Sequence, residues 1–191
     1  MRARTVANAG LLACAIALTG CTTLGRDASP LATVPRVDLV RYSGTWYEIA
    51  RYPNRFQSQC AGDVTAQYSP RDDGTIEVIN ACRRADGTLD RALGTARVAD
   101  PATNAQLEVR FAPAALAWLP LVWGDYYVIA LAPDYRYALV GAPSRDYLWV
   151  LSRTPALAEA DYAQLAEAAR RAGFDPARLQ RTNQSAKPPR G

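Results

Sequence analysis

The chain has 191 residues, a formal net charge of +4 and no histidine. Its length fits one domain with a sizeable core, and its mild charge argues against a nucleic-acid partner. The lack of histidine excludes His-based catalytic triads and His-ligated metal sites, and the sequence has no Gly-rich phosphate loop, so we expect neither a cofactor nor a metal.

The N-terminus has the features of an export signal. Arg2 and Arg4 precede an apolar stretch over residues 6–18, which is too short to span a bilayer comfortably. The stretch ends at Leu18-Thr19-Gly20-Cys21, which resembles the bacterial lipobox. We therefore expect residues 1–20 to be a lipoprotein signal peptide and Cys21 to carry lipid. An ordinary signal peptide with an incidental cysteine is the alternative.

Residues 21–38 are small, polar and interrupted by proline, which predicts a loosely structured tether between lipid and domain. Thr22 follows the cysteine, where aspartate usually accompanies retention in the inner membrane. This sorting resemblance predicts a protein anchored in the outer membrane and facing the periplasm.

From Tyr42 to Arg153, short apolar runs alternate with turn residues. This pattern predicts eight antiparallel strands, at residues 45–51, 62–69, 75–82, 89–98, 105–111, 125–132, 136–141 and 147–152. An up-and-down barrel has such spacing, and so does a sandwich with Greek-key connections. Periodicity alone leaves the two open.

The cysteines predict one disulfide. Cys14 would leave with the signal peptide and Cys21 would carry lipid, so Cys60 and Cys82 remain in a chain exported to an oxidising compartment. The turn at residues 70–74 sets the register of two antiparallel strands and places these two cysteines nearly opposite each other. We predict that they are bridged; two free buried thiols are the alternative.

After the last strand the pattern becomes helical. Apolar residues recur at helical spacing and Gly173 ends the run, which predicts a helix over residues 156–172 on the outside of the sheet. Residues 183–191 contain two prolines and are expected to form a disordered tail.

Two motifs decide between sandwich and barrel. Residues 44–51 (GTWYEIAR) are similar to the first-strand signature of lipocalins, and residues 146–155 (DYLWVLSRTP) resemble the eighth strand of bacterial outer-membrane lipocalins and their apolipoprotein D relatives. Pro133-Asp134-Tyr135 matches a third lipocalin motif only in part, since proline replaces threonine. The resemblance implies an all-β fold: an eight-stranded antiparallel up-and-down barrel with one C-terminal flanking α-helix, over about residues 39–182.

The resemblance also implies a closed barrel base where the Arg153 guanidinium stacks on the Trp46 indole. If both side chains point inward, the two-residue period of a strand turns Glu48 and Ala50 inward as well. The same rule turns Leu148 and Val150 outward, under the helix.

The candidate ligand-binding residues follow from that alternation. Tyr68, Val78 and Asn80 would line one wall, and Tyr147 and Trp149 another, which gives the apolar wall with few polar groups that is typical of a ligand pocket. The alternative is that these side chains fill a solid core.

The connection after Phe111 is unusually apolar, and strand alternation places it at the barrel mouth. Within residues 112–124 we single out Trp118 and Trp123, together with Leu119 and Leu121, as a lip that contacts the membrane or guides a ligand. A plug folded back into the cavity is the alternative.

We therefore expect a binding protein for a fatty acid, lysophospholipid or similar molecule. The second hypothesis is an enzyme, for which Glu48 is the one inward carboxylate, and we interpret it instead as a buried partner of an arginine or tyrosine. The third is an envelope scaffold that binds a protein partner through the apolar mouth loop. The sequence leaves the ligand and a homodimer open.

Overall fold

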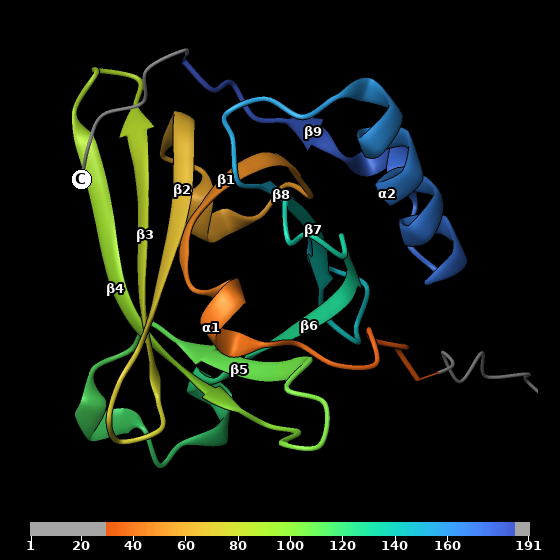
Figure 1. Cartoon of the computed structure of the whole chain (residues 1–191). Helices are drawn as coiled ribbons and strands as arrows, with labels where there is room; N and C mark the ends of the chain where they lie inside the picture. The colour runs from red at the N-terminus through yellow and green to blue at the C-terminus, as the bar shows by residue number, and fades with distance from the viewer. Residues whose placement is uncertain (1–29, 186–191) are drawn as a thin grey trace, which may run out of the picture.

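The computed structural model describes residues 30–185 and shows one continuous antiparallel sheet (Figure 1). The sheet runs in the order β2-β3-β4-β5-β6-β7-β8-β1-β9, and a further pairing of β1 with β2 closes it into a barrel. Residues 1–29, which include the predicted signal peptide and Cys21, and residues 186–191 lie outside the described residues. The strands are β1 (Gly44–Arg51), β2 (Cys60–Pro70), β3 (Ile76–Arg84), β4 (Leu89–Val98), β5 (Gln106–Arg110), β6 (Gly124–Leu131), β7 (Tyr137–Gly141), β8 (Leu148–Ser152) and the short β9 (Gln180–Arg181).

The predicted barrel is confirmed, and each of the eight predicted strands overlaps an observed one. The helices are α1 (Leu39–Tyr42) and α2 (Glu159–Arg171), with single 3-10 turns η1 (Arg55–Gln57), η2 (Ala114–Leu116), η3 (Pro120–Val122) and η4 (Pro176–Arg178). Asp38 caps α1, because its carboxylate accepts the backbone N–H groups of Val40 and Arg41.

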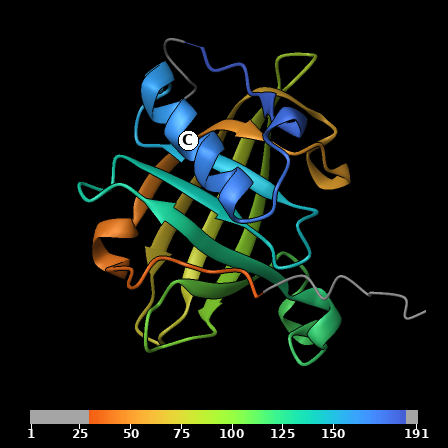
Figure 2. The same cartoon turned by 90° about the vertical axis from the view of Figure 1, so that its right-hand side faces the viewer.

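The barrel has two different ends. Because successive strands alternate in direction, the connections β1–β2, β3–β4, β5–β6 and β7–β8 share one end, which we call the open end. The other connections and α1 mark the closed end. Figure 2 shows α1 on the left of the barrel, and η1 and the η2–η3 connection on the right.

Buried side chains form an inner and an outer apolar cluster. The inner cluster lies inside the barrel around Trp46, and the outer one lies between the barrel wall and α2. As predicted, Leu148 and Val150 face outward, and they are buried in the same cluster as Leu165 and Ala169 of α2. The outer cluster thus joins the outer face of β8 to α2, whose backbone lies closest to β6 and β7.

One predicted orientation is wrong. The pairing of β1 with β8 shifts between Glu48 and Ala50, which is a β-bulge. Beyond it Ala50 pairs with Val150 and lies in the outer cluster, whereas Arg51 pairs with inward-facing Trp149. The extra residue reverses the alternation, so Arg51 takes the inward place that we expected Ala50 to have.

The Cys60–Cys82 disulfide is present, with 5.5 Å between the two Cα atoms. Its register differs from the prediction. Cys60 pairs with Arg84, two residues beyond Cys82, and β2 has irregularities between Cys60 and Thr65. A diagonal neighbour on an adjacent strand is still within disulfide distance. The bridge ties the end of the β1–β2 connection to the last part of β3.

The expected tether is partly wrong. Leu31 and Val37 are buried in the outer and inner clusters, and the backbone N–H groups of Val34 and Val37 donate to Val128 O (2.9 Å) and Thr103 O (2.8 Å). Residues 30–38 thus pack along the barrel. No helix within residues 30–185 is long and apolar enough to cross a membrane.

Residues 183–185, which we expected to belong to a disordered tail, pack against the barrel. Strands β1 and β2 pair only as far as Tyr47 with Thr65, and residues 182–185 bridge the two strands beyond that point. The Gln184 side-chain amide donates to the carbonyl oxygens of Glu48 (2.9 Å) and Val64 (2.8 Å). We call residues 182–185 the C-terminal strap.

Candidate functional site

The closed end is sealed by the predicted pair. The Arg153 guanidinium lies 3.9 Å from the centroid of the Trp46 ring and donates to the carbonyl oxygens of Thr45 and Arg41. The Trp46 indole N–H donates to Tyr42 O at 2.8 Å. Each polar group that this stack buries thus has a partner, so the barrel floor is closed without a penalty for unsatisfied groups.

Tyr135 of the partial third motif joins the same end. Its hydroxyl accepts the Asp38 N–H at 2.9 Å, and the Arg41 guanidinium lies 4.0 Å above its ring. Tyr135 has a positive φ of 63°, as the tight β6–β7 turn requires. The proline at position 133 is compatible with this turn, and its carbonyl accepts from Arg41.

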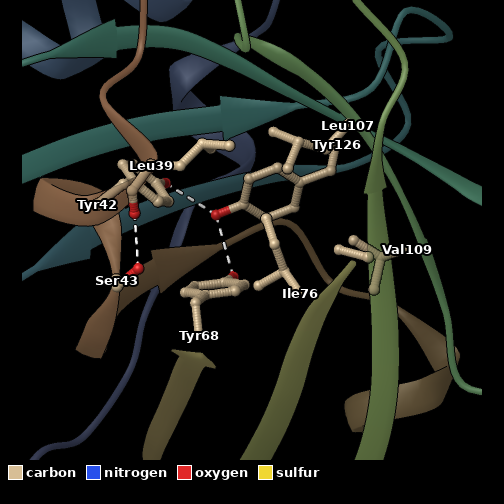
Figure 3. A pocket seen from close by; sticks show the side chains of 9 residues that line it. Leu39, Tyr42, Ser43, Tyr68, Ile76, Leu107, Val109 and Tyr126 are labelled. Atoms are coloured by element: carbon tan, nitrogen blue, oxygen red, sulfur yellow. Dashed lines mark hydrogen bonds between the residues drawn. The ribbon is translucent and has the colours of Figure 1, made fainter. Parts of the chain in front are cut away.

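Three tyrosines form a second layer above the floor (Figure 3). The hydroxyl of Tyr126 hydrogen-bonds to that of Tyr42 at 2.8 Å and accepts from that of Tyr68 at 3.0 Å. Burial raises the pKa of all three phenols, that of Tyr68 to about 12, so all three are neutral at physiological pH. The cavity beside them measures about 10 Å³, which is room for roughly one water molecule.

Two of the predicted ligand-binding residues therefore lie in a packed floor. Tyr68 and Val78 belong to the inner cluster with Ile76 and Ala96. In the half of the barrel next to the closed end, these side chains fill a solid core, which was the alternative to a ligand pocket.

The inner wall nearer the open end is less covered than the floor. The regular β3–β4 register places Asn80 opposite Ala92 on the same inner face as Val78 and Gly94. Asn80 is half-buried and Ala92 is exposed, although both point inward. The ring of Phe111 lies against the inner face of Gly94, because an added Cβ there would meet it at 2.8 Å, yet Phe111 is 45% exposed. Solvent therefore reaches this inner wall, which we call the cup.

Asn80 is a polar group of the cup wall, and Asp90, nearer the open end on the same face, is engaged by Arg84 and Gln59. The side-chain oxygen of Asn80 is buried and accepts no hydrogen bond from any described residue. A buried acceptor without a partner costs free energy, and a donor on a bound molecule would remove that cost.

Tyr147 and Trp149 form the opposite rim with Phe56 of η1. The two predicted rings stack with centroids 6.0 Å apart, and Phe56 lies 5.4 Å from Tyr147. The Trp149 indole N–H donates to the Gln57 side-chain oxygen at 3.1 Å. These contacts hold an aromatic face in position beside the cup.

Glu48 is buried and fully engaged, as expected for a partner of an arginine. Its carboxylate accepts from Arg51 (2.6 Å), Gln57 (2.7 Å) and the Thr182 hydroxyl. A carboxylate held in this way positions the β1 rim and has no free oxygen for proton transfer. Within residues 30–185, no group of three acidic, cysteine or histidine side chains is arranged to hold a metal ion.

The mouth loop does not form a plug. Trp118 is 76% exposed and Leu121 is 93% exposed, so both point into solvent. Trp123 lies on the outside of the barrel, where the Arg97 guanidinium is 4.1 Å from the centroid of its ring. Its indole N–H donates to Ala117 O. The seven predicted ligand-binding residues are thus divided between floor, cup wall, rim and outer surface.

The structure adds Phe111, Phe56, Gln57 and Arg51 to the site. Phe111 could have been found from Gly94, since a glycine within a strand indicates that another group approaches the backbone closely. Phe56 and Gln57 lie in a connection without periodicity, and Arg51 is turned inward by the bulge, so no pattern rule identified them.

Comparison with known proteins identifies the family. The lipocalin-like domain family matches residues 37–184, most of the chain. The chain belongs to the lipocalin-like family. This lipocalin is 44% identical to Temperature-induced lipocalin-1 of Arabidopsis thaliana over 165 residues, or 85% of this chain and 88% of that protein. It is 42% identical to Outer membrane lipoprotein Blc of Escherichia coli strain K12, covering 76% and 78%.

More distant relatives share the fold. Apolipoprotein D of Rattus norvegicus is 34% identical over 145 residues, 70% of this chain and 69% of that protein. Insecticyanin from the tobacco hornworm Manduca sexta superposes with a TM-score of 0.63 at 19% identity, covering 81% and 85% of the two chains. Lobster apocrustacyanin A1 gives 0.61 at 18% identity, covering 76% and 79%. These structures support the closed barrel with one helix that the lipocalin motifs predicted.

Proposed function

We propose that this lipocalin binds a small apolar or amphipathic molecule, such as a fatty acid or lysophospholipid, in the cup. The observation that supports this proposal is the division of the interior into a filled floor and a wall that solvent reaches, which consists of Ala92 and Phe111 with the Asn80 amide and faces the aromatic rim of Tyr147 and Trp149. Such a wall is mainly apolar and carries one unpartnered amide oxygen that can orient a ligand. Burial of an acyl chain there contributes roughly 0.8 kcal/mol per methylene.

A cavity-filling substitution tests this proposal. Ala92→Trp places an indole inside the cup, whereas Leu93→Trp places the same side chain on the outer face of the same strand, where Leu93 is already 64% exposed. We expect A92W to weaken binding of a fluorescent fatty acid at least tenfold and L93W to leave it unchanged. Equal affinities for the two variants would show that the ligand binds elsewhere.

We also propose that lipid on Cys21 holds the protein in the outer membrane, facing the periplasm. The lipobox at residues 18–21 supports this, as does the similarity to a protein named outer membrane lipoprotein. Cys21→Ser should abolish incorporation of labelled palmitate and membrane fractionation, while Cys14→Ser, within the signal peptide, should retain both. Labelling of the C21S variant would contradict the anchor.

A scaffold that binds a protein through the mouth loop is the second candidate. The exposure of Leu116, Trp118 and Leu121 in one loop favours it, since a contiguous exposed apolar patch marks an interaction site. Native mass spectrometry of gently extracted protein separates the two: a bound lipid supports the cup, and an empty barrel with a protein partner supports the scaffold. The same spectrum reports any homodimer.

A further inference from the structure

Exposed apolar side chains gather at one end of the barrel. Within residues 30–185, eight large apolar side chains are more than a third exposed, and seven of these belong to the open half. The seven are Phe56, Leu89, Leu93, Phe111, Leu116, Trp118 and Leu121. Only Val40, on α1, lies at the closed end. The asymmetry indicates that the open end meets an apolar surface.

The mouth loop is suited to a lipid surface in particular. The segment from Phe111 to Trp123 contains no charged residue, so its entry into a bilayer desolvates no charge. Trp118 projects from it, and tryptophan favours the boundary between lipid and water because its ring is apolar and its N–H is polar. Two short 3-10 turns, η2 and η3, hold the loop in shape.

The N-terminal segment leaves the barrel toward the same end. The backbone N–H of Val37 donates to Thr103 O, in the β4–β5 connection at the closed end. Three residues earlier in the chain, the N–H of Val34 donates to Val128 O, in the middle of β6. Leu31 is buried one step further along. Figure 2 shows this segment crossing from the side of α1 toward the side of the η2–η3 connection. The described chain therefore begins near the open end.

We propose that the open end faces the bilayer that holds the lipid on Cys21, so that a ligand passes between membrane and cup without crossing bulk water. This orientation rests on the proposed anchor. Extended chain spans at most about 3.6 Å per residue, so Cys21 lies within roughly 30 Å of Pro30. The tether and the mouth loop give two attachments on one side of the barrel, and together they fix which end points to the membrane.

Quenching by brominated lipid tests the orientation with the full lipidated chain. The protein is reconstituted in vesicles of phosphatidylethanolamine and phosphatidylglycerol with brominated acyl chains, after the cup has been saturated with oleic acid. We expect strong quenching of tryptophan emission in the wild type and loss of most of it in Trp118→Phe. Val40→Trp in the W118F background adds an exposed indole at the closed end, and this indole should stay unquenched.

Each other outcome overturns the orientation. Quenching of the V40W probe at least as strong as that of Trp118 would place the closed end at the membrane. If the protein binds the vesicles but its tryptophan quenching is the same in wild type and W118F, the mouth loop lies in water. Protein that does not remain with the vesicles would remove the anchor on which the orientation rests. Fatty-acid binding by W118F in detergent, measured in parallel, shows whether the cup functions independently of these results.

Discussion

Arg153 and Trp46 meet at the base of the barrel, with the guanidinium carbon 3.9 Å from the ring centroid. The same guanidinium donates to Thr45 O at 2.9 Å and to Arg41 O at 2.7 Å. One side chain at the end of β8 therefore joins the start of β1 and the last turn of α1. Because these segments are far apart in the sequence, this contact stabilises closure of the barrel rather than any single element.

Removing that side chain should cost more than a surface arginine does. Arg153→Ala loses a cation–π contact and leaves three carbonyl groups, those of Thr45, Arg41 and Tyr135, without their charged donor, so we expect the free energy of unfolding to fall by about 2 to 4 kcal/mol. Arg153→Lys should lie between, since an ammonium lacks the planar fork. Urea unfolding measures both. Arg136→Ala, which breaks an exposed pair with Asp161, is the control and should cost under about 1 kcal/mol; a similar loss in R153A would argue against the closure role.

The pair was predictable because residues 44–51 and 146–155 resemble two lipocalin motifs, which contain this tryptophan in the first strand and this arginine just after the eighth. The number of strands and the C-terminal helix were predictable from two-residue and helical periodicities, which reflect burial directly. The Cys60–Cys82 bridge was predictable from the number of cysteines and from the turn at residues 70–74. The β-bulge after Glu48 was not, because one extra residue leaves no mark in composition. This bulge turns the Arg51 side chain toward the barrel interior.

The cup itself was predictable only in outline. Periodicity placed Tyr68, Val78 and Asn80 on one inner face, and the structure agrees, but it could not show that the first two lie in the filled floor. That depends on how far three tyrosine rings reach across the barrel. The strap at residues 182–185 could not be predicted either, because it fills a gap between β1 and β2 that only the tertiary structure creates.

The tyrosine layer gives a second prediction. Tyr126 bonds to both Tyr42 and Tyr68, so Tyr126→Phe leaves two buried hydroxyls without a partner. Tyr68→Phe removes one bond and leaves the other intact. At about 1 to 3 kcal/mol for each unsatisfied buried group, we expect Y126F to lower the free energy of unfolding by about 2 to 6 kcal/mol. Y68F leaves no hydroxyl without a partner, so it should cost only about 0.5 to 1.5 kcal/mol, the net contribution of one hydrogen bond. Chemical denaturation of the two variants side by side gives the comparison, and equal losses would contradict a central role for Tyr126.

Asp63 links the strap to pH. Burial opposes its ionisation, but hydrogen bonds from Ser185 and the Arg83 guanidinium outweigh burial and lower its pKa. A folded pKa below the unfolded one means that the ionised form stabilises the strap above about pH 4, and that this contribution is lost as the pH falls through the folded pKa. The strap should therefore stay bound at neutral pH and loosen only in strong acid.

Hydrogen exchange of a peptide covering residues 180–185, corrected for the intrinsic pH dependence, tests this link. Wild-type protection should fall only below about pH 4. Asp63→Asn should show low protection already at neutral pH and little further change in acid. Asp125→Asn, at an exposed carboxylate on β6, is the matched control and should follow the wild type. Full protection in D63N at neutral pH would mean that the strap does not depend on this carboxylate.

Gly62 lies where the strap passes closest to β2, and this gives the last prediction. A Cβ at that position would be 2.5 Å from Asn183 O, a backbone atom that accepts the Asp63 N–H at 2.8 Å. Gly62→Ala must therefore push the strap away, and we expect a loss of about 1 to 3 kcal/mol in the free energy of unfolding together with faster exchange in residues 180–185. Gly124→Ala is the control, because its Cβ would meet Val109 O at an ordinary 3.7 Å. If G62A kept the stability and the strap protection of G124A, the strap would have to be loose enough to yield, and its role in closing the gap between β1 and β2 would be lost.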